Sequence, residues 1–237
     1  MEALLLAGGK GERLGDSARG RPKPLVPVAG RPLAAYAVAR LAAAGVERVI
    51  VSCAAGFEEL FESELSGLGA DVVAVGEREP LGRGGGLRLA ASARAESGPV
   101  LAANGDELLD VDLGALLALH VERGVAATVV VARMPSAFGV VELGEDDRVV
   151  AFREAPRLPH WVNAGLYVLG EEALTALPER GDHEATTFPA LAADGRLAAF
   201  RHEGVWLTVN TPKDLRRAEE FLTTRADWHP QAVGAAS

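Results

Sequence analysis

The sequence is poor in the residues on which several common chemistries depend. Its 237 residues contain a single cysteine, Cys53, so no disulfide can form within the chain. Cys53 closely follows the apolar run 49–51 and is expected to be a small core residue. The histidines show no metal-ligand spacing and form no recognisable Ser-His-Asp set, which leaves zinc chemistry and covalent serine chemistry unsupported. They are His120, His160, His183, His202 and His229.

Long apolar runs and an excess of positive charge are also absent. No apolar span has the length of a transmembrane helix, and the chain does not open with a basic and then apolar leader. We therefore expect a cytoplasmic protein with no membrane partner. The 33 acidic residues outnumber the 24 basic ones, and the formal net charge of −9 argues against general binding to nucleic acid. Positive charge for an anionic ligand must be local.

Lysine is the rarest of the charged residues, and its positions are informative. Among the basic residues only Lys10, Lys23 and Lys213 are lysines, and two of these lie in the opening segment 4–33. That segment starts as an apolar run of buried-strand type and continues into a loop that contains Gly8, Gly9 and Gly11. Glycines after a strand let backbone N–H groups approach a phosphate closely, and Arg13 and Lys23 add fixed positive charge. The segment therefore predicts a polyphosphate site.

This loop differs from two common nucleotide-binding fingerprints. The string G-x-x-x-x-G-K-[ST] of P-loop proteins does not occur, and G-x-G-x-x-G breaks at Leu14, where its last glycine would stand. A P-loop ATPase and a nicotinamide dehydrogenase are both disfavoured.

The first half of the chain alternates between apolar runs and helical periodicity. Strands are predicted at 3–7, 47–52, 71–75 and 99–103, and helices at 32–44, 57–66, 84–95 and 112–123. This order favours an α/β fold with a mostly parallel sheet and helices on both faces. In such sheets ligands bind beyond the C-terminal ends of the strands, where the opening loop, the segment 79–86 and Asp106 are all expected to lie.

Short strands dominate after residue 124. They are predicted at 126–132, 139–143, 148–153, 162–168, 197–201 and 205–209, with helices at 171–176, 184–193 and 212–222. We interpret this region as a second half packed on the same sheet. The segment from about residue 225, rich in Ala, Pro and Gly, is expected to be frayed.

Two segments at the expected strand ends carry candidate ligand contacts. Residues 79–87 contain four glycines in five positions, which would let the backbone lie flat against a planar ligand, although a flexible loop before a helix has the same composition. Asn104-Gly105-Asp106 follows an apolar strand, and a carboxylate there is well placed to hold Mg²⁺, which prefers oxygen ligands. A simple Asn-Gly-Asp turn is the alternative. Asp112 and Thr211 are predicted helix N-caps.

The string G-G-x-G-x-R-L, followed by P-K-P-L-V-P-V-x-G-x-P, resembles the signature of sugar-1-phosphate nucleotidylyltransferases, also called nucleotide-sugar pyrophosphorylases. Further similar segments extend to about residue 222. The resemblance implies a single Rossmann-like three-layer α/β/α nucleotidyltransferase domain over residues 1–224, with a mostly parallel mixed sheet. Residues 1–124 would form a nucleotide-binding half, residues 125–224 a sugar-binding half, and residues 225–237 a flexible tail.

The resemblance also implies roles for individual residues. Arg13 and Lys23 would be catalytic, and Asp106 and Asn210 would hold Mg²⁺. Contacts to the nucleotide are implied for Leu6, Ala7, Gly8, Gly9, Gly11, Glu79, Gly82, Gly85, Asn104 and Gly105. Contacts to the sugar are implied for Gly139, Glu154 and Asn163, in segments similar to Y/F-G-V-V, F-x-E-K-P and N-A-G-x-Y.

The chain departs from the family pattern at several of these positions. Arg83 replaces a usual Thr, and could reach phosphate or only solvent. Ala155 stands where the family has a Lys that contacts the sugar phosphate, so Arg153 or Arg157 substitutes or the phosphate is held differently. Thr208 stands where the family often has an Asp that binds metal, and Asn210 stands two residues later in place of a Gly.

The activity implied by the resemblance is transfer of a nucleotidyl group from a nucleoside triphosphate to a sugar 1-phosphate, with release of pyrophosphate. Mannose-1-phosphate guanylyltransferase and glucose-1-phosphate uridylyl- or thymidylyltransferase are the most similar activities. Two alternatives stay open: a guanylyltransferase acting on molybdopterin or cobinamide, and a nucleotide-sugar sensor with impaired catalysis. A homo-oligomer is also possible on family habit.

Overall fold

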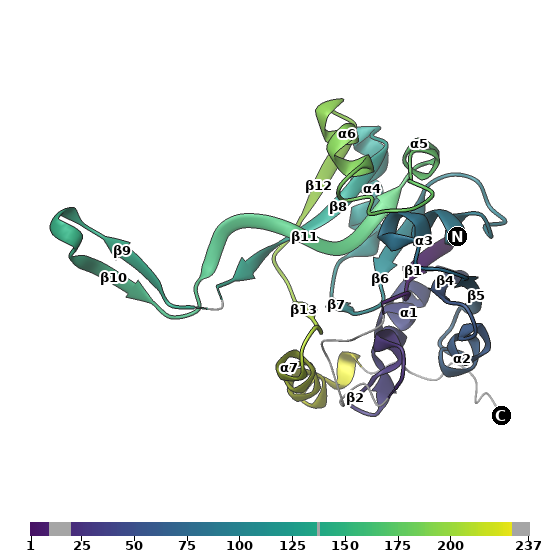
Figure 1. Cartoon of the computed structure of the whole chain (residues 1–237), viewed down its shortest axis with the longest axis horizontal. Coiled ribbons are helices and arrows are strands. Elements are labelled where there is room, and N and C mark those ends of the chain that lie inside the picture. The colour runs from purple at the N-terminus through teal and green to yellow at the C-terminus, as the bar shows by residue number, and fades with distance from the viewer. Residues whose placement is uncertain (10–19, 137, 229–237) are drawn as a thin grey trace.

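The computed structural model describes residues 1–9, 20–136 and 138–228 of the chain (Figure 1). Its centre is a seven-stranded sheet in the order β12-β8-β11-β6-β1-β4-β5. Neighbouring strands are parallel except at β11, which is antiparallel to both β6 and β8. The bounds are β1 (Glu2–Leu6), β4 (Arg48–Ala54), β5 (Asp71–Glu77), β6 (Val100–Asn104), β8 (Ala127–Pro135), β11 (Arg157–Leu169) and β12 (Leu197–His202). The predicted mostly parallel mixed sheet is confirmed.

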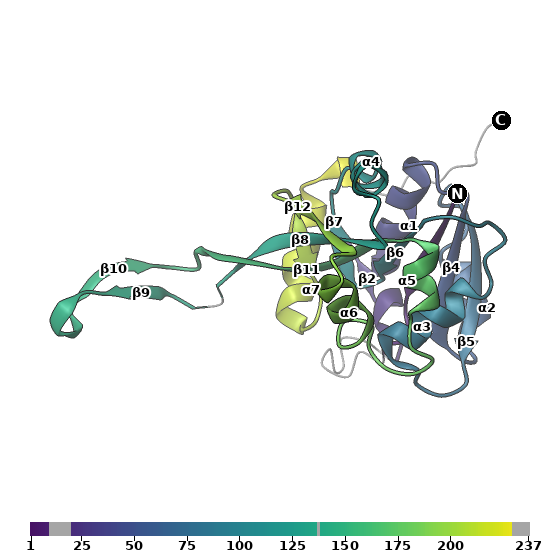
Figure 2. The ribbon, with the colours of Figure 1, turned by 90° about the horizontal axis from the view of Figure 1, so that it is seen from above.

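Helices cover both faces of this sheet (Figure 2). One face packs against α1 (Leu33–Ala43), α2 (Glu58–Glu64) and α4 (Leu113–Arg123), and the other against α3 (Gly82–Ala91), α5 (Glu171–Thr175) and α6 (Thr187–Ala193). The alternation of side chains along a strand explains why both are needed: in β1, Ala3 and Leu5 enter the first core and Leu4 the second. Cys53 is fully buried in the first core, as predicted.

Local sequence signals define several helix ends. The side chain of Asp112 accepts a hydrogen bond of 2.9 Å from the backbone N–H of Ala115 at the start of α4. Thr211 and Asp214 form a reciprocal capping box at the start of α7 (Pro212–Thr223), with Pro212 in the first turn. Both predicted N-caps are confirmed.

Two small strand pairs connect α7 to the body, and of their four strands the sequence analysis predicted only the one at 205–209. They are β2 (Pro27–Val28) with β3 (Arg31–Pro32), and β7 (Glu107–Leu109) with β13 (Trp206–Thr208); a 3-10 turn, η2 (Lys23–Leu25), precedes β2. Together with one face of α7 they enclose a third apolar cluster around Tyr36, Leu108 and Val209. This cluster ties the loop after β6 to the segment before α7.

The first residues of the region expected to be a flexible tail are packed on the body. Residues 226–228 form a short 3-10 turn, η4 (Ala226–Trp228), and Trp228 is only 5% exposed. Its ring packs edge-on against Phe221 and lies under the guanidinium of Arg40, 4.9 Å from the ring centre. The prediction at residue 225 is therefore corrected: burial of a large aromatic side chain holds the chain to residue 228.

The second half joins the sheet through β8, β11 and β12, as predicted, but one part of it stands apart. Residues 138–156 leave the body as a long arm that ends in the antiparallel hairpin of β9 (Val140–Leu143) and β10 (Val149–Arg153). Figures 1 and 2 both show this hairpin projecting far from the body. The turn at its tip contains the 3-10 segment η3 (Glu145–Asp147). Among the described residues, no helix is both long and apolar enough to cross a bilayer.

Removing the Trp228 side chain tests whether the end of the described chain belongs to the core. We expect Trp228→Ala to lower the free energy of unfolding by about 3 kcal/mol, because a buried aromatic is replaced by a cavity. This corresponds to a fall in Tm of roughly 6–12 °C for a chain of this size. Val121→Ala, at an exposed position of α4, is the control and should change the stability by less than about 0.5 kcal/mol. Equal effects of the two variants in calorimetry would contradict the packing of Trp228.

Candidate active site at the ends of the parallel strands

A cleft of about 740 Å³ opens at the C-terminal ends of β1, β5 and β6. The strand order reverses between β1 and β6, and in open α/β sheets such a reversal leaves a crevice that binds ligands. The lining residues are Leu6, Gly8, Gly9, Lys23, Pro24, Glu77, Pro80, Gly82, Arg83, Asn104, Asp106, Glu107, Asp182, Thr208 and Asn210. Eight of the residues expected to contact nucleotide, phosphate or metal are in this set: Leu6, Gly8, Gly9, Lys23, Gly82, Asn104, Asp106 and Asn210.

The ammonium group of Lys23 lies at the centre of the site. Its Nζ atom donates to Asp106 Oδ2 at 2.5 Å and to Asn210 Oδ1 at 2.7 Å. The lysine is 9% exposed and comes from η2, whereas its partners follow β6 and β13. Two hard oxygen atoms from distant parts of the chain therefore converge on one cationic position.

Backbone contacts hold these groups in place. Gly105, between Asn104 and Asp106, donates its N–H to the carbonyl of Leu6 at 2.9 Å, and a Cβ atom at this position would meet that carbonyl oxygen at 2.9 Å. Only glycine allows the loop after β6 to lie this close to β1. The carbonyl of Asp106 accepts from the N–H of Val209, which brings Asn210 to the same side of the cleft.

Glu77 forms the floor of the cleft between two glycines. Its carboxylate accepts from Ser52 Oγ at 2.8 Å and from the N–H of Leu81 at 3.0 Å. Cβ atoms at Gly8 and Gly86 would lie 2.8 and 2.9 Å from Glu77 Oε1, so both glycines make room for this carboxylate. The sequence analysis missed Glu77 because it ended the strand at residue 75. The same signal that singled out Asp106, a carboxylate at a strand end, could have found it.

Glu107 is a second acidic residue that the sequence analysis missed. Burial, together with the neighbouring charge of Asp106, raises the pKa of its carboxyl to about 8. Trp206 Nε1 donates to Glu107 Oε2 at 2.7 Å, and Asn104 also bonds to the carboxyl. At neutral pH this group is therefore mostly a neutral acid, so it adds little negative charge beside Asp106.

The glycine-rich segment 82–86 contacts another part of the same chain. The N–H groups of Gly84 and Gly85 donate to the carbonyl of Gly181, at 2.8 and 3.3 Å. Cβ atoms at Gly82 and Gly85 would come within 2.7 Å of backbone atoms of the loop 178–184. The close approach of this loop, and not only a ligand, accounts for the glycines. Gly85 itself does not line the cleft, whereas Gly82 does.

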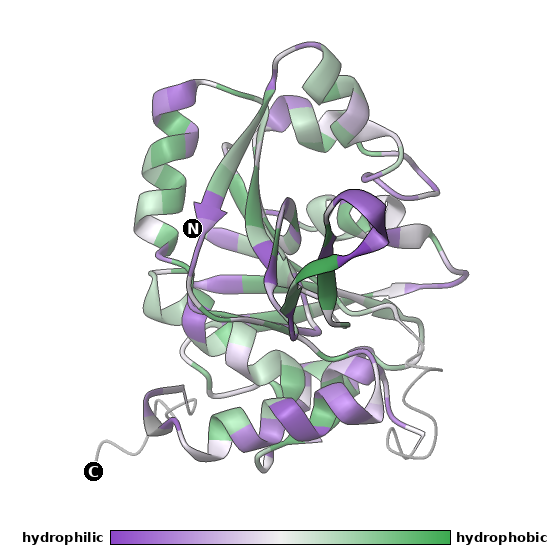
Figure 3. Cartoon of the chain, turned by 90° about the vertical axis from the view of Figure 1, so that its left-hand side faces the viewer, coloured by the Kyte–Doolittle hydropathy of each residue, from purple (hydrophilic) through white to green (hydrophobic). Residues whose placement is uncertain are grey.

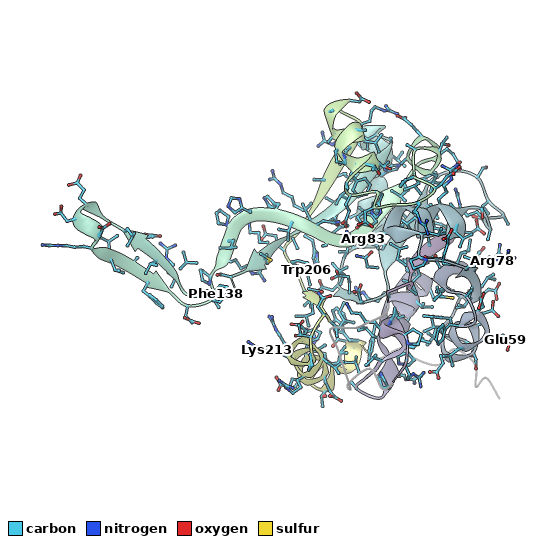
Figure 4. All side chains as sticks on the ribbon, in the orientation of Figure 1. Glu59, Arg78, Arg83, Phe138, Trp206 and Lys213 are labelled. Atoms are coloured by element: carbon cyan, nitrogen blue, oxygen red, sulfur yellow. The ribbon has the colours of Figure 1, made fainter. Side chains whose placement is uncertain are left out.

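Arg83 forms the wall between this cleft and a second one. Its Nε and one terminal nitrogen donate to the two oxygens of Asp182 at 3.3 and 3.2 Å, and the other terminal nitrogen lies 2.5 Å from Glu184 Oε2. The hydrogen bond to Asp182 raises the pKa of Arg83. Figure 4 shows the side chain near the middle of the molecule. Asp182 and Glu184 belong to no recognisable motif, so no sequence signal could have found them.

The second cleft has a volume of about 610 Å³ and shares Arg83, Asn104 and Glu107 with the first. Its other lining residues are Val129, Val131, Asn163, Gly165, Glu184, Phe188, Leu197, Ala198 and Ala199. Asn163 donates to Glu184 Oε1 at 2.7 Å and to the Tyr167 hydroxyl at 2.8 Å, and its own oxygen accepts from the N–H of Gly165. The predicted sugar-binding Asn163 thus lies in this cleft with partners from its own chain.

Several expected site residues are not brought to either cleft. Glu79 is exposed and pairs with Arg180 at 2.7 Å, and Ala7 is buried below the cleft. Gly139 and Glu154 lie at the root of the arm, where the Phe152 ring covers Gly139. Gly11 and Arg13 fall outside the described residues.

The chain belongs to the nucleotidyl transferase family, whose model matches residues 2–225. It is 36% identical over 234 residues to a mannose-1-phosphate guanylyltransferase of Mycobacterium tuberculosis, covering 94% of this chain and 64% of that protein. It is 33% identical over 225 residues to the catalytic subunit beta of a Danio rerio mannose-1-phosphate guanylyltransferase, covering 90% of this chain and 62% of that protein. The chain thus spans less than two thirds of the length of these two relatives.

Solved structures share the fold. HddC from Yersinia pseudotuberculosis, complexed with GMP-PN, superimposes with a TM-score of 0.72 at 22% identity and covers 93% of this chain and 99% of its own. A putative glucose-1-phosphate thymidylyltransferase from Bacillus anthracis gives a TM-score of 0.74 at 19% identity, with 93% and 95% covered. The nucleotidyltransferase fold expected from the sequence is confirmed.

The raised pKa of Glu107 gives the stability of the protein a defined pH dependence. A glutamate in the unfolded chain ionises near pH 4.5, whereas Glu107 in the folded chain has a pKa of about 8. Between these values the folded state binds more protons, so the free energy of unfolding falls as the pH rises from about 5 to 8. We expect Glu107→Gln to be more stable than the wild type at pH 8.5, by on the order of 2–4 kcal/mol, with the difference vanishing near pH 5.

Urea titrations at a series of pH values measure this difference directly. Glu59→Gln, at an exposed position of α2, is the control and should not produce a gain that grows with pH. A constant difference between Glu107→Gln and wild type at all pH values would show that Glu107 does not carry the effect.

Proposed function

We propose that the chain transfers a nucleotidyl group from a nucleoside triphosphate to a sugar 1-phosphate, releasing pyrophosphate. The observation that carries this proposal is the position of the Lys23 ammonium between Asp106 and Asn210, inside the first of the two adjoining clefts. One cleft suits the triphosphate and the other the acceptor. The names of the two mannose-1-phosphate guanylyltransferase relatives support guanosine triphosphate and mannose 1-phosphate as the first substrates to test.

In this reaction an oxygen of the sugar phosphate attacks the α-phosphorus of the nucleotide in line with the departing pyrophosphate. No general base is required, because a phosphate monoester carries a charge of about −1.5 to −2 at pH 7. The protein's contribution is then alignment and charge neutralisation. Lys23 stabilises the charge that develops at the α-phosphate, and the backbone of Gly8 and Gly9 borders the polyphosphate. Arg13 is proposed to hold the leaving pyrophosphate.

Asp106 and Asn210 fit a magnesium ion. Their oxygens already converge on one cation, the Lys23 ammonium, and Thr208 Oγ accepts from the Asn210 amide at 2.5 Å, which orients the Asn210 oxygen toward the cleft. Among the described residues, no three or more Asp, Glu, Cys or His side chains are grouped so that they could hold a metal ion, so the phosphates would complete the coordination shell, as is usual for Mg²⁺. When bound, Mg²⁺ would neutralise phosphate charge and help to align the two substrates.

The substrate pair is identified by measuring pyrophosphate release for each nucleoside triphosphate with mannose, glucose and N-acetylglucosamine 1-phosphates. We expect the guanosine and mannose pair to exceed the others. Nucleotide binding by calorimetry without turnover for any pair would overturn the proposed enzyme and favour a nucleotide-sugar sensor.

Lys23→Ala is expected to lower kcat by about 10²–10³, the usual effect of losing one group that stabilises charge in the transition state. Nucleotide binding, measured separately by calorimetry, should persist. Lys213→Ala is the matched control, since that lysine is exposed on α7 and should leave kcat unchanged. A Lys23→Ala enzyme with the wild-type rate would refute the assignment.

Arg83 is the residue that we propose for holding the phosphate of the acceptor. The family's lysine is replaced by Ala155, Arg153 pairs with Glu142 on the arm, and Arg157 bonds to the carbonyl of Glu203. Arg83, in contrast, borders both clefts. A guanidinium has five N–H donors, and three of those of Arg83 point to Asp182 and Glu184. Two remain without a partner among the described residues and are available to a phosphate.

We therefore expect Arg83→Thr, which restores the residue usual in the family, to raise the KM for the sugar 1-phosphate by about 10- to 100-fold. The KM for the nucleotide should change by less than about threefold. Arg78→Thr is the control, because Arg78 is exposed at the outer edge of the molecule (Figure 4). Steady-state kinetics with each substrate varied in turn distinguish the cases: an equal rise in both KM values would contradict a role specific to the acceptor.

A further inference from the structure

The arm ends in a ribbon with one apolar face and one mixed face. The pairing of β9 with β10 places Val141 opposite Phe152 and Leu143 opposite Val149, all on one side. The opposite side carries Glu142 and Arg153, which form an ion pair, together with Val140 and Ala151. Figure 3 shows the hydrophobic strands of this ribbon and its hydrophilic tip. Apolar residues therefore recur at every second position of the ribbon, a pattern that is typical of a strand with one face packed on a core.

This apolar face is exposed to solvent. Leu143 is 62% exposed, Val149 58% and Phe152 66%, and at the root of the arm Phe138 is 79% exposed. The body of the molecule buries side chains of the same types almost completely. An isolated two-stranded hairpin is at best marginally stable in water, and an exposed apolar patch of this kind marks an interaction surface.

The two ends of the arm carry charges of opposite sign. The tip carries Glu145, Asp146 and Asp147, all exposed, and they are followed by the exposed Arg148, so the formal charge of the tip is negative. The root carries the exposed Arg133, Arg157 and Arg201 against one exposed carboxylate, Glu154. The guanidinium groups of Arg133 and Arg201 stack on the Trp161 ring. An acidic tip and a basic root are complementary only if a second arm lies antiparallel to the first.

We propose that the arm is the dimerisation element of the protein and that its partner is a second copy of this chain. In a two-fold arrangement each acidic tip meets the basic root of the other arm, while the two apolar faces pack between them. Such a self-complementary patch is what a two-fold interface requires. Covering the apolar face and the Phe138 region in both copies would bury on the order of 1,000 Å² in total, the lower range of specific interfaces.

Sedimentation velocity between 1 and 100 µM tests the proposal without any measurement of activity. The wild-type protein is expected to be a dimer at the upper concentrations. The double variant Leu143→Glu with Phe152→Glu should raise the dissociation constant at least 100-fold, because the charges cannot be buried in an apolar interface. Its Tm should match that of the wild type, since the ribbon lies apart from the body. Val121→Glu, another exposed apolar residue, on α4, is the control and should remain dimeric.

A charge exchange tests the antiparallel arrangement itself. Glu145→Lys with Asp146→Asn removes two of the three carboxylates of the tip, and asparagine tolerates the positive φ of 62° at position 146. Arg133→Glu with Arg157→Glu reverses the charge at the root. We expect each pair of substitutions to weaken the dimer about tenfold or more, and the combination of both pairs in one chain to restore it.

Two results would overturn the proposal. One is a wild-type protein that stays monomeric at 100 µM, and the other is a dimer that the Leu143 and Phe152 substitutions leave intact. A dimer that depends on the apolar face but is not restored by the combined charge exchange would exclude the tip-to-root arrangement.

Discussion

The position of one ammonium group organises the candidate site. Lys23 reaches two oxygen atoms, on Asp106 and Asn210, that are 83 and 187 residues away in the sequence. Burying this lysine requires a carboxylate beside it, and the carboxylate in turn requires the loop after β6 to lie against β1, which only Gly105 permits. The small sheet of β7 and β13 then brings the segment before α7 to the same point. Fold and site thus depend on the same few contacts.

Much of this arrangement could be predicted from the sequence, because short stretches of residues determine where strands end and where turns form. The predicted strands that end at residues 7 and 103 gave the positions of Gly8 and Asp106, and the predicted order of strands and helices placed both residues at one edge of the sheet. The loop 178–184 could not be predicted, since its contacts with Gly84 and Gly85 are backbone contacts that no side-chain pattern records. The sequence analysis singled out these glycines because they can approach a ligand closely, whereas in the structure Gly82, Gly84 and Gly85 closely approach another loop of the same chain.

Charged residues show the same difference between what the local sequence indicates and what contacts with distant segments determine. The arginine at position 83 was visible as a departure from the family, but its surroundings were not: Asp182 and Glu184 come from a distant turn and hold the guanidinium at the boundary of the two clefts. Glu107 also looks like an ordinary acidic residue in the sequence. Only its burial and the neighbouring charge of Asp106 raise its pKa to about 8, which makes it mostly a neutral acid at neutral pH in the candidate site.

The arm relates these observations to the assembly that we propose. Its root carries Gly139 and Glu154, which the sequence analysis assigned to the sugar, and its apolar face is left exposed by the rest of the chain. The ribbon has the alternating pattern of a strand that covers a core, but its apolar face covers none. In the body, by contrast, both faces of the sheet are buried. A second copy of the chain would cover this apolar face, and the acidic tip and basic root of each arm would then pair with those of the other. On this view the period-two pattern of residues 140–153 indicates an interface rather than a core.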